Sequence, residues 1–131
     1  MPTPSFEKVA FLFYGAGLTA GSSAVLYEAV ADEPNPKVRA ASISATFLLS
    51  VLGGTIRTWA NPKTSWAERM ASTAASVSLA IACVSNASGE TRVATFATMT
   101  GGTFIGAWNA AMIWRLRTPE PPTLENLRTF V

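Results

Sequence analysis

Four long uncharged segments most strongly constrain this chain. They run over Val9–Tyr27, Ala40–Ile56, Met70–Gly89 and Val93–Trp114, and they are 19, 17, 20 and 22 residues long. All eighteen charged side chains lie before, between or after them. Because a helix rises about 1.5 Å per residue, roughly 20 residues cross the hydrocarbon core of a bilayer. The spacing therefore predicts an integral membrane protein with four transmembrane helices.

A soluble four-helix protein is the alternative, since the hydrophobic fraction of 49% is not unusual. A helix at the surface of a soluble bundle carries charged residues on one face, at a spacing of 3.6 residues. None of the four segments has such a face, so the pattern favours the membrane.

The connections between these segments indicate where the helices end. Pro34 and Pro36 lie in the first connection, where neither interrupts a span, and Asn61-Pro62 opens the second. Ser65 and Glu68 match a capping box. We expect an all-α, four-transmembrane-helix bundle with helices over 7–31, 38–60, 66–86 and 91–117. The short third connection predicts that helices three and four form an antiparallel hairpin, and an even number of spans places both termini on the same side.

Charge and aromatic residues predict the orientation. The side that carries the termini holds seven basic residues, and the other holds Lys37, Arg39 and Arg92. The positive-inside rule places the richer side in the cytoplasm or an equivalent matrix. Aromatic residues anchor helices at the membrane surface. The predicted interfacial anchors are Trp59, Trp66 and Trp114 near the termini and Tyr27 on the other side.

Small residues predict how the helices pack. Gly17 and Gly21 form a GxxxG motif in the first segment, and Gly102, Gly106 and Ala110 continue a four-residue spacing in the fourth. Small residues let helix backbones approach closely in lipid. These five residues are the predicted helix-packing positions, either within the chain or against the helices of a partner. The third segment is rich in Ala and Ser, which serves packing and could also supply the polar stripe of a pore.

Side chains that commonly catalyse reactions or bind metals are scarce in this chain. The chain has no His and a single cysteine, Cys83, so haem, zinc and iron–sulfur sites of the common kinds are not expected. Proton and ion paths through a membrane require an acid or base deep within a span, and none of these segments contains one. Asn109 is the strongest polar group there and is expected to bond between helices. We predict no catalytic, metal-binding or cofactor-binding residues, no nucleic-acid partner, and structural phospholipid as the bound molecule.

The layout resembles the mitochondrial inner-membrane translocase channel family, one branch of which is an accessory subunit of respiratory complex I. The resemblance rests on four Gly- and Ala-rich spans, on Ala16–Ala20 and on Gly101–Gly106. The family has an Asp four residues after an Arg that follows the second span, whereas Arg57 is followed by Asn61 here. This difference favours the accessory-subunit branch over translocation. The resemblance implies a mitochondrial inner membrane, a respiratory complex and membrane-embedded partner subunits.

These features together predict a non-catalytic accessory subunit of a large respiratory complex, which packs against core helices and lipid. The alternatives are a small oligomeric transporter, channel or protein-translocation component, and a pigment- or quinone-associated subunit. The predicted domains are a membrane domain over 1–117 and a proline-rich tail over 118–131. In the tail, Leu124, Leu127 and Phe130 share one side of a short predicted helix, which we expect to dock on a neighbouring subunit or on lipid headgroups.

Overall fold

The computed structural model describes residues 3–118, with side chains from Lys8 onward. All regular structure in this part is helical. The helices are α1 (Thr3–Val30), α2 (Pro36–Ala60), α3 (Trp66–Ser88) and α4 (Thr91–Arg117). The predicted all-helical class and the positions of the four helices are confirmed, and the ends differ from prediction by at most a few residues. The predicted tail residues Leu124, Leu127 and Phe130 lie outside the described residues.

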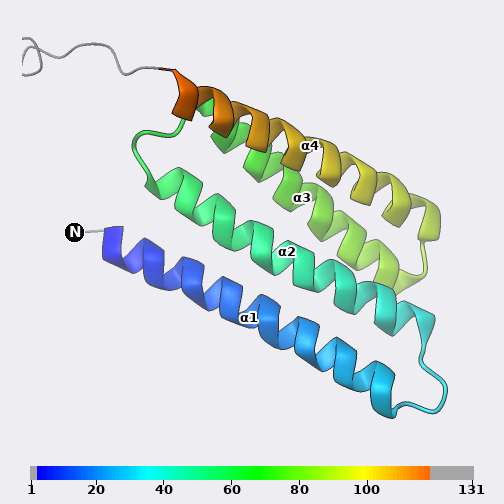
Figure 1. Cartoon of the computed structure of the whole chain (residues 1–131). Coiled ribbons are helices and arrows are strands. Elements are labelled where there is room, and N and C mark those ends of the chain that lie inside the picture. Colours follow the sequence, from blue (N-terminus) through cyan, green and yellow to red (C-terminus); the bar gives the residue numbers. More distant parts are fainter. Residues whose placement is uncertain (1–2, 119–131) are drawn as a thin grey trace, which may run out of the picture.

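The four helices lie side by side in chain order, as one layer (Figure 1). Helix α1 packs on α2, α2 on α3, and α3 on α4; within residues 3–118 no other helix pair makes backbone contact. The layer therefore has two open faces and two edge helices, α1 and α4. We call the end where α1 begins and α4 finishes the terminal end, and the other the distal end.

Local sequence explains where the helices begin and end. The Asn35 side chain accepts a hydrogen bond from the Lys37 backbone N–H at 2.9 Å, and Pro36 occupies the first turn of α2. The predicted capping box is present at the start of α3. Gly89 ends α3 with φ of 80°, a left-handed conformation that glycine adopts without steric cost. The chain can therefore reverse within a few residues and begin α4.

Small side chains occupy the contacts between the helices. The buried apolar residues of the described part are mostly alanines, and the buried polar ones are mostly Ser and Thr. These side chains bond across the layer: the Thr55 Oγ1 lies 2.9 Å from the Ser76 Oγ and donates to the Ser72 carbonyl at 3.1 Å. The hydroxyls of α3 thus pack between helices, as small-residue contacts in membranes do.

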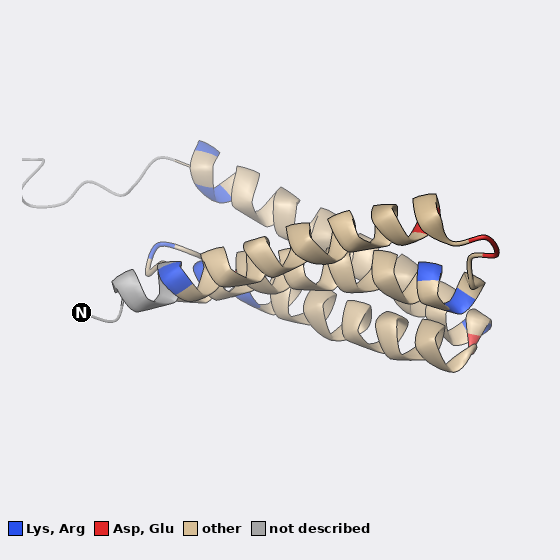
Figure 2. Cartoon of the chain, turned by 90° about the horizontal axis from the view of Figure 1, so that it is seen from below, with Lys and Arg blue, Asp and Glu red and all other residues tan. Residues whose placement is uncertain are grey.

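Large apolar side chains point outward from the layer. Leu18 is 74% exposed and Phe96 77% exposed, and many similar residues share this placement. Charged residues gather at the two ends and leave the middle of the layer uncharged (Figure 2). Helix α1 from Lys8, α2 and α3 are long and apolar enough to cross a membrane. These three helices fit an integral membrane protein.

Candidate functional site

A buried carboxylate joins α3 to α4 at the terminal end. Glu68 is 1% exposed, and its Oε2 accepts hydrogen bonds from the Ser65 N–H at 2.8 Å, the Ser65 hydroxyl at 3.1 Å and the Arg115 Nε at 2.8 Å. The capping box places this side chain, and α4 brings the guanidinium to it. The charge on Glu68 is therefore both paired and hydrogen-bonded, as a buried charge requires.

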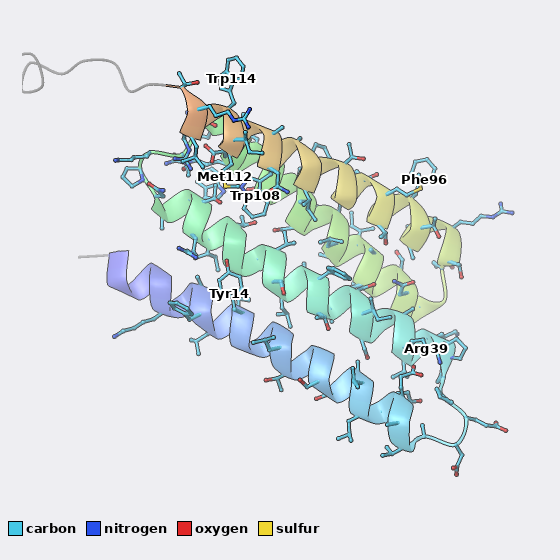
Figure 3. All side chains as sticks on the ribbon, in the orientation of Figure 1. Tyr14, Arg39, Phe96, Trp108, Met112 and Trp114 are labelled. Atoms are coloured by element: carbon cyan, nitrogen blue, oxygen red, sulfur yellow. The ribbon has the colours of Figure 1, made fainter. Side chains whose placement is uncertain are left out.

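Two adjacent glycines of α2 receive aromatic side chains from both sides. A Cβ at Gly53 would lie 2.9 Å from the Tyr14 ring of α1, and a Cβ at Gly54 would lie 2.5 Å from the Trp108 ring of α4. Trp108 thus reaches α2 from a helix that makes no backbone contact with it, and Figure 3 shows this side chain between the two helices. Only a residue without a side chain leaves room for these rings.

A pocket opens between these two features. Its volume is about 490 Å³. The lining combines the large apolar residues Trp108 and Met112 with the basic residues Arg57 and Arg115. Other lining residues include Tyr14, Gly54, Thr58, Asn61, Thr64 and Glu68. We call this cavity the arginine pocket.

The arginine pocket carries an excess of positive charge. Glu68 is the one acidic side chain described at the terminal end, and Arg115 pairs with it. The Arg57 side chain has no hydrogen bond or ion pair within the described part of the chain. Basic residues crowd this end, as Figure 2 shows. Those described are Lys8, Arg57, Lys63, Arg69, Arg115 and Arg117. The pocket is therefore suited to an anion.

The predicted interfacial aromatics lie at the two ends of the layer. Trp59 and Trp66 stack edge to face with centroids 5.8 Å apart, and the Arg69 guanidinium lies 5.5 Å from the Trp59 centroid. Trp114 points away from the layer in Figure 3. At the distal end, the Tyr27 hydroxyl accepts a hydrogen bond from the Asn35 N–H at 3.0 Å. Tyr27 therefore also holds the connection between α1 and α2.

The predicted packing glycines differ in what surrounds them. A Cβ at Gly17 would lie 3.1 Å from the Ser50 Oγ, and one at Gly21 would lie 3.3 Å from the Thr46 Cγ2, so both glycines face α2 closely. A Cβ at Gly102 or Gly106 would meet no described atom within 4 Å. The structure brings the first two into helix contact and leaves the last two, with the exposed Ala110, on the open side of α4.

Asn109 also lies on the open side of α4. Its side chain is exposed and has no hydrogen-bond partner among residues 8–118, so the expected bond to another helix of this chain is not made there. On a helical wheel it falls close to Gly102 and Gly106. These three residues form what we call the α4 stripe.

Several site residues were not singled out from the sequence. Gly53-Gly54 is visible there as a glycine pair inside an apolar segment, which signals close approach of another group. Trp108 is visible as an aromatic residue away from the predicted interfaces. Arg115 and Glu68 are 47 positions apart, and nothing local in the sequence relates them.

Comparisons with known proteins provide no relative. No family model matches the chain, and no curated protein or solved structure is significantly similar to it.

Proposed function

We propose that this chain is a non-catalytic, membrane-embedded subunit that packs its open helix layer against other membrane subunits and lipid. The observation that carries the proposal is the distribution of side chains, which is the reverse of that in a soluble protein. Alanine and serine fill the helix contacts, while large apolar residues are exposed on all four helices. Such exposed apolar area needs lipid or protein to cover it.

The proposal includes four spans, with α4 as the fourth. This helix has 27 residues and is uncharged from Val93 to Trp114. Four of its five threonines leave no free hydroxyl, because Thr95, Thr98, Thr100 and Thr103 each donate to the carbonyl four residues earlier. Intrahelical bonding of this kind lowers the cost of placing threonine in lipid. In this arrangement α3 and α4 form an antiparallel hairpin, with both chain ends on the basic side.

The α4 stripe supports a protein partner over lipid alone. An unpaired amide in hydrocarbon costs free energy, and small residues beside it would let another helix approach closely enough to bond with it. A partner helix seated on Gly102, Gly106 and Asn109 satisfies both requirements. The resemblance described above suggests that this partner belongs to a respiratory complex of the mitochondrial inner membrane.

The channel alternative gains little from the structure. A pore needs a polar stripe that faces an open path, and the serines of α3 that could have formed one are buried between helices. The Ser76 hydroxyl bonds to the Thr55 hydroxyl of α2, and the Ser72 hydroxyl donates to the Arg69 carbonyl within α3.

Blue-native electrophoresis after mild detergent extraction tests the proposal. We expect the chain to migrate in a large assembly that contains other membrane subunits and carries oxidoreductase activity. Migration as a small homo-oligomer would contradict the subunit proposal and favour a transporter. Extraction of the chain by alkaline carbonate would contradict the membrane proposal itself.

A further inference from the structure

The arginine pocket contains hydrogen-bond donors without acceptors. The Arg57 guanidinium, the Tyr14 hydroxyl and the Trp108 indole N–H have no hydrogen-bond partner within residues 8–118. Arg115 uses its Nε for Glu68, and its two terminal nitrogens make no described bond. The cavity is lined by several free donors and by one carboxylate, which already accepts three hydrogen bonds. Such a lining is suited to a ligand that brings acceptor oxygens.

The pocket also has a polar end and an apolar end. Arg57, Asn61 and Arg115 lie where α2 and α4 end, whereas Gly54, Trp108 and Met112 lie one to two turns further along the same helices, toward the middle of the layer. Figure 3 shows Met112 and Trp108 in this order from the end of α4. The lining therefore changes from charged to apolar in the direction that leads into the membrane.

We propose that the arginine pocket binds an anionic phospholipid, with its phosphate at Arg57 and Arg115 and its acyl chains against Trp108 and Met112. This inference rests on the proposed membrane location, because only a membrane supplies such a ligand at this depth. Basic pockets between membrane helices recognise anionic headgroups in this way. A free phosphate ester would satisfy the arginines but would leave the apolar end uncovered.

Within this proposal, Arg57 distinguishes anionic from zwitterionic lipid. Arg115 forms an ion pair with Glu68, so its charge is balanced within the chain. Arg57 supplies the net positive charge of the pocket and can bond two phosphate oxygens at once. Replacement of Arg57 should therefore remove selectivity without removing a structural contact.

Native mass spectrometry of the purified full chain in detergent tests this assignment. The probes are palmitoyl-oleoyl phosphatidylglycerol and phosphatidylcholine, which share the same acyl chains. We expect wild type to retain phosphatidylglycerol roughly tenfold better, because the choline of phosphatidylcholine cancels the phosphate charge that would otherwise balance the charge of Arg57. Arg57→Gln should bring the two lipids close to equal retention, and Arg57→Lys should give an intermediate ratio.

Arg117→Gln provides the matched control, because Arg117 is exposed at the same end but does not line the pocket. It should keep the wild-type ratio. Equal loss of selectivity in both variants would overturn the pocket assignment in favour of diffuse surface charge, and full selectivity in Arg57→Gln would overturn it as well. Complete displacement of the lipid by millimolar glycerol 3-phosphate would show that the site takes a free phosphate ester instead. These readings use the isolated chain, so they are independent of whether it joins a larger complex.

Discussion

Glu68 has two structural roles at once, as a helix cap and as an ion-pair partner. Its carboxylate caps α3 through Ser65 and accepts a hydrogen bond from Arg115 of α4. Glu68→Gln should leave Arg115 without its counter-charge at a site that is 1% exposed. We expect a loss of roughly 1–3 kcal/mol in the free energy of unfolding. Unfolding of the detergent-solubilised chain, followed by tryptophan fluorescence, measures the difference.

Glu90→Gln provides the control for this substitution, because Glu90 precedes α4 and makes no side-chain cap bond. Its effect should stay within about 0.5 kcal/mol, as for other surface changes. In Glu68→Gln/Arg115→Gln no charge is left unpaired, so this double variant should recover part of the stability. A double variant as unstable as the sum of the single ones would argue against direct coupling.

Gly53 tests the close approach of α1 to α2. A Cβ here would meet the Tyr14 ring at 2.9 Å and the Ala10 backbone carbonyl at 3.1 Å, and the backbone cannot move without shifting α1. Gly53→Ala should destabilise the chain by about 1–3 kcal/mol, as overpacking generally does. Gly15→Ala is the matched control, since open space surrounds Gly15, and it should be neutral or slightly stabilising. Equal stability of the two variants in the same unfolding assay would refute the contact.

At the scale of helices, α1 and α4 use their glycines differently. Gly21 faces Thr46 of α2, so Gly21→Leu should lower the stability of the isolated chain. Gly102 has open space beside it, so Gly102→Leu should leave the isolated chain unchanged and reduce only its recovery with a partner. Thermal unfolding in detergent and co-purification from membranes separate the two effects. Normal co-purification of Gly102→Leu would mean that the α4 stripe faces lipid.

Sequence reasoning was accurate where local chemistry decides the structure. The capping box at Ser65 and Glu68 marks the start of α3, and the uncharged segments mark all four helices. It could not supply the order of packing, because glycine motifs in two helices do not say whether those helices meet. Gly17 and Gly102 carry similar motifs, yet one contacts α2 and the other faces open space. The arginine pocket was missed for the same reason, since its lining residues come from all four helices and only tertiary contacts bring them together.

At the scale of the whole molecule, the layer exposes mid-helix residues that a soluble protein would bury. Leu18, Phe47, Val77 and Phe104 lie near the middle of the four helices and are 74%, 58%, 54% and 36% exposed. Single cysteines at these positions, in a Cys83→Ser background, should resist aqueous thiol reagents in intact membranes, because lipid or partner subunits cover them. Glu33→Cys in the first connection should react quickly. Rapid labelling at position 104 alone would contradict the proposed fourth span, α4.

The chain-order packing of the helices has a consequence for biogenesis. Each helix finds its backbone neighbour in the segment made just before it, so no helix has to wait for a distant one. Contacts that are local in sequence form with little loop-closure cost. Packing can therefore proceed in chain order, one helix after another. The last helix then completes the layer from its far edge, when Trp108 reaches Gly54 and Arg115 meets Glu68.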